Sequence, residues 1–116
     1  MSENCHLEDI AHINKILSDS LTVASGHPVD TMKFYSSKIK DFNEEIEQGV
    51  LLIFNNEELI KVEYCNHIKS SIKKFISNNN DIENIGIGII YDIKNVYSQE
   101  KALKLIENYL SLIFKI

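Results

Sequence analysis

The sequence predicts a single α+β domain, in which helices pack on a small three-stranded mixed sheet in the order ααββαβα. Apolar residues recur every three or four positions up to about residue 48, a period that is typical of helices. The period then changes to short apolar or alternating runs, which are typical of strands, before a final helical stretch. The 116 residues are expected to form one domain over 1–116, with residues 1–6 as a frayed end.

Two helices are predicted in the first half of the chain. The first covers residues 7–23 and ends before Gly26 and Pro28, which favour termination. The second covers residues 30–48, with Asp30 or Thr31 as its cap. Its apolar stripe consists of Met32, Tyr35, Ile39, Phe42 and Ile46. We expect these two helices to pack as an antiparallel pair.

The middle of the chain predicts a hairpin followed by a helix and a third strand. A continuous apolar run over 50–54 indicates a buried strand, and Asn55 and Asn56 suit a tight turn. Alternation over 60–65 indicates a half-exposed strand. A helix is predicted over 66–77 and a third strand over 85–93. Because a helix separates the last two strands, we expect them to pair in parallel through a crossover.

A final helix is predicted over residues 98–115. Its apolar residues cover more than half of its circumference, which indicates either a central core helix or one half of an interface. This helix is therefore the expected surface for a homodimer, if the protein forms one.

The charge distribution is acidic and uneven. Seventeen acidic residues face twelve lysines, without arginine, for a net charge of −5. An acidic chain repels a phosphate backbone, so nucleic-acid binding is not expected. Residues 1–49 hold nine acidic residues and four lysines, whereas residues 50–116 are balanced. This asymmetry favours a basic protein partner.

A cytoplasmic location is expected from the sequence. The N-terminus is polar and acidic, unlike a signal peptide, and no apolar run approaches the roughly 20 residues of a membrane span. Cys5 and Cys65 have no paired-motif spacing, which is typical of free thiols in a reducing compartment.

Four patterns resemble chemical sites, but each has a simpler interpretation. Cys5, Glu8 and His12 have metal-ligand spacing, but they lie on a solvated helix face. The pair Cys65 and His67 lacks an oxyanion donor and an orienting third group. The glycines Gly86 and Gly88 lie inside a strand, where they allow close packing rather than phosphate binding. Asp92 at the end of that strand supports no mechanism alone. We therefore predict no catalytic residue, cofactor or metal.

The best candidate for a binding site lies on the polar face of the helix predicted over 30–48. A phenylalanine surrounded by carboxylates is a plausible hot spot for a basic partner. The alternative is a solvated acidic face, with the phenylalanine folded against a neighbouring loop. The predicted partner-binding residues are Asp30, Phe34, Asp41, Glu44 and Glu45.

These features predict a protein-binding inhibitor rather than an enzyme. In overall character, though without a shared motif, the chain is similar to the bacterial immunity proteins that neutralise toxins. A basic nuclease toxin domain is the expected cognate partner, because an acidic protein can block a site built for an acidic substrate. The alternatives are an acidic secretion chaperone or adaptor subunit and, less favoured, a small enzyme or ligand sensor in which Cys65 and His67, or Asp92, line a pocket.

Overall fold

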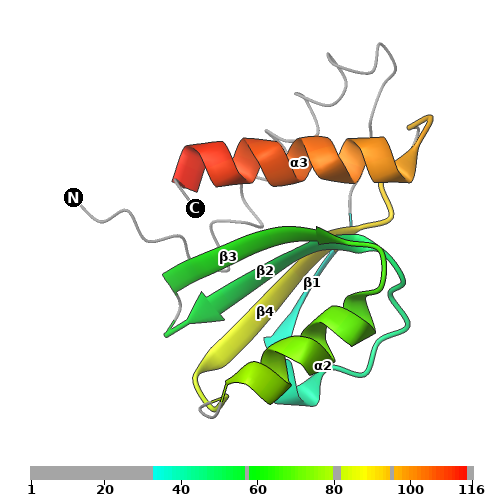
Figure 1. Cartoon of the computed structure of the whole chain (residues 1–116). Helices are drawn as coiled ribbons and strands as arrows, with labels where there is room; N and C mark the ends of the chain where they lie inside the picture. The colour runs from blue at the N-terminus through cyan, green and yellow to red at the C-terminus, as the bar shows by residue number, and fades with distance from the viewer. Residues whose placement is uncertain (1–32, 57, 80–81, 95, 115–116) are drawn as a thin grey trace.

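The computed structural model describes residues 33–56, 58–79, 82–94 and 96–114. These residues form a four-stranded antiparallel sheet with strand order β1-β4-β2-β3. One helix, α3, lies over one face of the sheet, and α2 lies on the other (Figure 1). The α+β class is therefore confirmed, but the prediction of a three-stranded mixed sheet is wrong. The helix predicted over 7–23 lies outside the described residues.

The second predicted helix is replaced by a strand, a short helical turn and an irregular segment. Strand β1 spans Lys33–Lys38 and pairs with β4, and the 3-10 helix η1 spans Ile39–Asp41. Aromatic residues favour strands and serine is a weak helix former, so the segment KFYSSK gains more from pairing with β4 than from a helix. The predicted stripe still marks burial, because four of its residues pack in the core beneath α2, namely Tyr35, Ile39, Phe42 and Ile46.

The predicted hairpin is confirmed. Strand β2 spans Gly49–Asn55 and pairs antiparallel with β3, Glu58–Cys65. Asn56 takes the positive φ of 52° that a tight turn requires. Ile53 pairs with Lys61 and Phe54 with Leu59, so Ile60 is the extra residue of a β-bulge. Ile60 is consequently 44% exposed.

Strand β4 is an inner strand of the sheet, between β1 and β2. Helix α2 spans Ile68–Asn78, and β4 spans Ile85–Tyr91. Both β3 and β4 run antiparallel to β2, so they share a direction, as the crossover prediction required. The prediction that they pair in parallel is wrong, because β2 lies between β3 and β4. The inner position of β4 agrees with its isoleucine-rich sequence and its burial.

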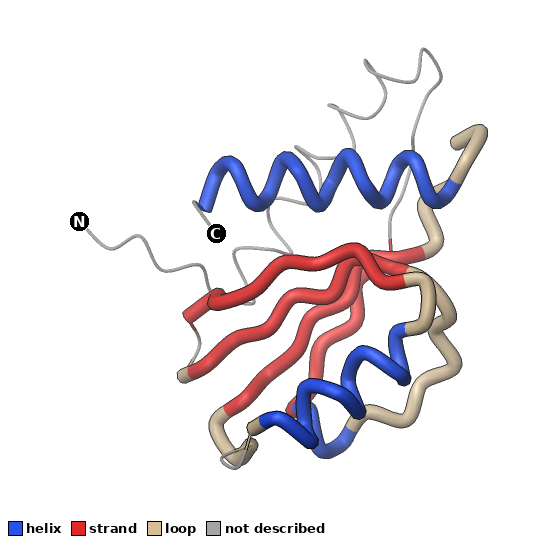
Figure 2. Tube along the Cα trace, viewed as in Figure 1, coloured by secondary structure: helices blue, strands red, loops and turns tan. Residues whose placement is uncertain are grey.

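The sheet separates two apolar cores, as the layers in Figure 2 illustrate. Alternate residues of β2 supply both cores: Leu52 packs on the α3 side, and Leu51 packs on the α2 side. Along β4, Ile85, Ile87 and Ile89 face α2. On β4, Ile90 faces α3, so Gly86 and Gly88, at alternate positions, lie on the same side.

Helix α3 spans Gln99–Phe114 and is tied to the sheet at two points. The Gln99 side-chain amide pairs with the backbone of Ile93, accepting from its N–H at 2.9 Å and donating to its carbonyl oxygen. The Glu107 carboxylate accepts a hydrogen bond at 2.5 Å from the backbone N–H of Tyr64 on the edge strand β3. No helix in the described part of the chain is long and apolar enough to cross a membrane.

Candidate partner-binding surface

Exposed carboxylates gather on the connection between η1 and β2. This acidic segment, residues 41–47, contains no lysine. Each of its acidic residues is solvent-exposed, namely Asp41, Glu44, Glu45 and Glu47. Glu47 was not among the predicted site residues, although four acidic residues within seven positions were visible in the sequence.

The acidic segment is anchored although it contains no regular structure beyond η1. Ile39, just before it, is 2% exposed, and Ile46 within it is 8% exposed. The rings of Tyr35 and Phe42 pack edge to face, with centroids 5.6 Å apart. The carbonyl oxygen of Glu47 accepts a hydrogen bond at 3.1 Å from the backbone N–H of Ile68 at the start of α2. These contacts fix the backbone that carries the carboxylates.

Most of these carboxylates have no ionic partner within the described part of the chain. Only Glu45 forms an ion pair there, with Lys69 of α2 at 2.7 Å. The Glu45 side chain is 89% exposed and that of Lys69 is 47% exposed, so the pair contributes little to stability. A shallow hollow of about 340 Å³ separates the segment from the start of α2 and is also lined by His67. The surface is therefore negative, uneven and accessible.

The predicted site residues do not all meet. Asp30 lies outside the described residues, whereas Asp41, Glu44 and Glu45 belong to the acidic segment. Phe34 lies in β1 and packs into the core beneath α3, whereas Ile39 and Ile46, which anchor the segment, pack beneath α2. The expectation that Phe34 and the carboxylates share a helix face is wrong, because residues 33–38 form a strand.

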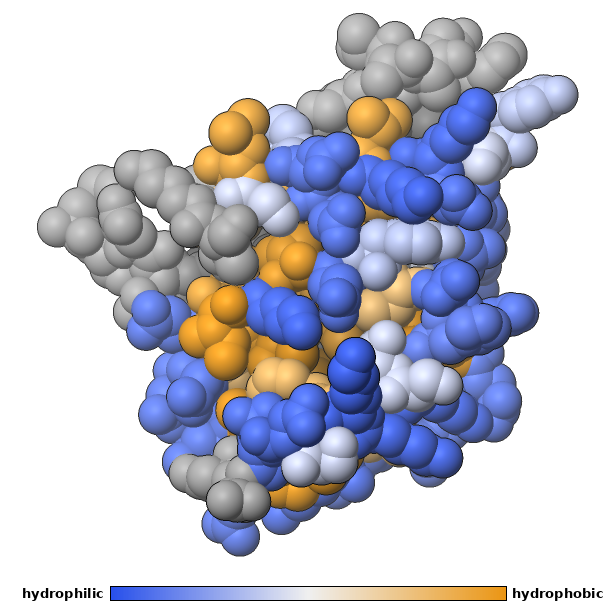
Figure 3. Space-filling model, viewed as in Figure 1, coloured by the Kyte–Doolittle hydropathy of each residue, from blue (hydrophilic) through white to orange (hydrophobic). Residues whose placement is uncertain are grey.

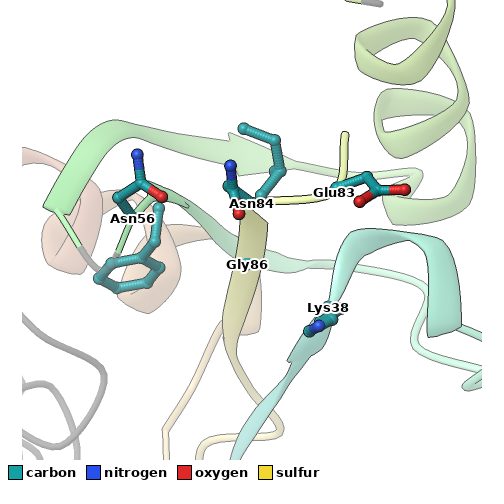
Figure 4. A pocket seen from close by; sticks show the side chains of 7 residues that line it. Lys38, Asn56, Glu83, Asn84 and Gly86 are labelled. Carbon is teal, nitrogen blue, oxygen red and sulfur yellow. The ribbon is translucent and has the colours of Figure 1, made fainter. Parts of the chain in front are cut away.

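A second concave region lies at the start of β4. This Gly86 hollow has a volume of about 420 Å³ and is lined by Lys38, Phe54, Asn56, Glu83, Asn84, Ile85 and Gly86. Figure 4 shows Asn56 on one side of Gly86 and Lys38 on the other. The sequence indicated close packing at the glycines of β4, but strand order was needed to show which residues surround them.

The Cys65 thiol is poorly suited to act as a nucleophile. It is 5% exposed, and burial raises its pKa to about 11. The thiolate, which is the reactive form, is therefore disfavoured at neutral pH. His67 is exposed at the N-cap of α2, and no hydrogen bond joins its side chain to the described residues. The geometry does not form an activated pair.

Asp92 forms no chemical site with the other described residues. Asp92 has a positive φ of 49° and forms an exposed ion pair with Lys33 at 2.9 Å. The Lys33 ammonium, by hydrogen bond and charge, holds the pKa of Asp92 below its usual value. Across the described ranges, no group of three or more His, Cys, Asp or Glu could hold a metal ion. The set Cys5, Glu8 and His12 lies outside those ranges.

Comparison with known proteins gave no relative. No protein-family model, curated protein or solved structure matches the chain.

Proposed function

We propose that this protein is an inhibitor that binds a basic protein partner through the acidic segment, in the manner of an immunity protein that neutralises a toxin domain. The observation that carries the proposal is the combination of exposure and anchoring in this segment. Its carboxylates face solvent, while Ile39 and Ile46 hold the backbone in the core. A pre-ordered surface loses less conformational entropy on binding than a flexible loop does.

The chemistry of the partner follows from charge complementarity. A nuclease domain is basic where it holds its phosphate substrate, so a rigid cluster of carboxylates suits that surface. Asp41, Glu44 and Glu47 form no ion pair with a described residue and so remain available to lysine or arginine of the partner. Such charges mainly raise the rate of association, because they steer the encounter.

A pull-down with matched baits tests this proposal. The wild-type protein and the variant Asp41→Lys, Glu44→Lys, Glu47→Lys are immobilised and exposed to an extract of the source cells. We expect the wild-type bait alone to retain a basic protein whose activity it inhibits, and the variant's circular dichroism spectrum to match the wild type. Equal retention by both baits would remove the acidic segment from the proposal.

A secretion chaperone or adaptor subunit is a second candidate, supported by the outer side of α3. Leu105 is 48% exposed and Leu112 is 80% exposed, and they lie on one side of the helix at a spacing of seven. Figure 3 shows hydrophobic surface on this side of α3, between hydrophilic residues. A dimer through this face would bury both leucines, and sedimentation of the purified protein distinguishes it from a monomer.

An enzyme is the least supported candidate. The raised pKa of Cys65 and the exposed position of His67 both oppose nucleophilic catalysis at this pair. We therefore propose binding, rather than a chemical step, as the activity of the protein. The inhibitor proposal is tested by changing the charge of the acidic segment, and the chaperone or adaptor candidate is tested at the apolar side of α3.

A further inference from the structure

Two glycines of β4 leave gaps in the α3-side face of the sheet. Gly86 pairs with Lys38 of β1 and with Phe54 of β2, and Gly88 pairs with Ser36 and Leu52 in the next row. Directly paired residues on adjacent strands point to the same face. The two rows that cross β1, β4 and β2 at Gly86 and Gly88 therefore lack a side chain at their centre.

The gap over Gly88 is filled by an aromatic ring of the chain itself. A Cβ atom built on Gly88 would lie 2.9 Å from Cζ of Phe34 and 3.0 Å from its Cε1. Phe34 pairs with Ile90, so its ring extends diagonally from its own row to the next. The chain thus shows that an aromatic ring fits a glycine gap in this face.

Among the described residues, no such ring lies over Gly86. Within the part of the chain that the structure describes, a Cβ atom built there would meet the carbonyl oxygen of Ser37 at 3.8 Å and Cβ of Phe54 at 3.9 Å, which are ordinary contacts. Neither crowding nor a positive φ requires glycine at this position. The residue placed to cover Gly86, as Phe34 covers Gly88, is Ser36, and its side chain is too short to do so. The Gly86 hollow is the space that results.

Glycine inside a strand is destabilising relative to alanine, and it commonly marks the close approach of another molecule. We propose that the Gly86 hollow binds an aromatic side chain, specifically tyrosine, of the protein partner. The ring lies over Gly86, while the amide groups of Asn56 and Asn84 and the Lys38 ammonium lie at the rim, where a phenolic oxygen finds hydrogen-bond partners.

The hollow also adjoins the acidic segment along the chain, because Lys38 immediately precedes η1, which ends at Asp41. The hollow lies on the α3 side of the sheet, whereas Ile39 and Ile46 anchor the acidic segment on the α2 side. A partner that contacts both must therefore extend around the edge strand β1, with an aromatic anchor in the hollow and basic residues against the carboxylates. This arrangement matches the usual composition of a binding hot spot, in which tyrosine and arginine dominate. The identity of the occupant as a protein side chain depends on the proposed function, whereas the preference for a ring does not.

The test uses N-acetyl-tyrosinamide as the probe and amide chemical shifts as the readout. In the wild type, we expect saturable shifts at Gly86, Asn84 and Asn56, and no comparable shifts with N-acetyl-alaninamide. The variant Ser36→Phe should place its own ring over Gly86 and weaken probe binding at least tenfold, whereas Ser36→Ala should bind as the wild type does. Gly86→Val, which fills the hollow from its floor, should also abolish the shifts. Circular dichroism checks that each variant is folded.

Equal shifts with both probes, or unchanged binding by folded Ser36→Phe, would overturn the inference. The pull-down then separates it from the proposed function. A basic partner that is retained equally by wild type and Ser36→Phe contradicts the hollow as a contact site but leaves the inhibitor proposal intact. Selective probe binding without any basic partner supports the hollow as a site for aromatic rings and contradicts the inhibitor proposal.

Discussion

Two strand glycines, Gly49 and Gly86, differ in the contacts that a side chain would make. A Cβ atom on Gly49 would lie 2.8 Å from the carbonyl oxygen of Ile90, a backbone atom that cannot move without breaking the sheet. We expect Gly49→Ala to lower the free energy of unfolding by roughly 1–3 kcal/mol, as overpacking does. Gly86→Ala is the matched control, and we expect it to be neutral or to stabilise by up to about 1 kcal/mol. Urea denaturation measures both, and equal losses would contradict the difference in packing.

Burial of the Cys65 thiol has a measurable consequence for the pH dependence of stability. The folded state holds the thiol proton up to a pKa of about 11, whereas the ordinary value is near 9. Between these values the folded state binds more protons, so the free energy of unfolding falls as pH rises through this window. In a Cys5→Ser background, we expect a steeper fall with Cys65 present than in Cys65→Ala, whose titrating tyrosines and lysines are the same. Equal slopes would contradict the burial of the thiol.

Among the elements, the edge strand β3 depends on α3 for the hydrogen-bond acceptor of one backbone N–H. The half-buried N–H of Tyr64 donates to the Glu107 carboxylate, which also blocks that position against pairing with another chain. We expect Glu107→Ala to lower the free energy of unfolding by about 1–3 kcal/mol, because the half-buried donor loses a charged acceptor. Glu107→Gln keeps an acceptor oxygen and should cost less. Thermal melts of both variants check the order, and an equal loss in both would show that the hydrogen bond contributes little.

The sequence predicted elements well wherever apolar spacing and local signals agreed. The hairpin of β2 and β3, and the helices α2 and α3, lie close to their predicted ranges. The helix prediction was wrong over residues 33–48. The spacing of Tyr35, Ile39, Phe42 and Ile46 fits a helix, yet these residues reach the same core from a strand, a turn and a loop. Pairing with β4, which is distant in sequence, decided their backbone, and a local period cannot report it.

The candidate site was predictable only in part for the same reason. The carboxylates Asp41, Glu44 and Glu45 are adjacent in sequence, so they stay together whatever backbone carries them. Phe34 was separated from them by the change from helix to strand. The Gly86 hollow depends on which strands flank β4, because Lys38 and Phe54 come from separate strands. Strand order is a long-range property that composition and periodicity do not contain.

For the whole molecule, substitutions at two leucines of α3 show whether the outer side of this helix is a dimer interface. Leu110 is 0% exposed and belongs to the core beneath α3, so Leu110→Asp should unfold the protein and cannot report on a dimer. Leu112 is 80% exposed, so we expect Leu112→Asp to preserve the fold. If a dimer forms through this side, Leu112→Asp will sediment as a folded monomer at concentrations where the wild type is dimeric. A dimer that persists in the variant would place the interface elsewhere.

Most of the net charge of the molecule, which is −5, lies in residues 1–32. Residues 1–32, which the structure does not describe, hold five acidic residues and one lysine. The acidic segment is therefore a local cluster rather than one side of a uniformly negative domain. Its effect on a partner should accordingly depend on position, and charge changes elsewhere on the sheet should matter less.

The association rate of the captured partner at several salt concentrations tests the central claim most directly. The wild type is compared with the triple variant Asp41→Asn, Glu44→Gln, Glu47→Gln. The matched control is the triple variant Glu58→Gln, Glu63→Gln, Glu100→Gln, which removes three charges elsewhere. We expect association with the wild type and the control to slow steeply as salt rises, and the acidic-segment variant to associate at least tenfold more slowly at low salt with a flatter dependence. Equal rates and equal salt dependence for all three proteins would contradict binding through the acidic segment.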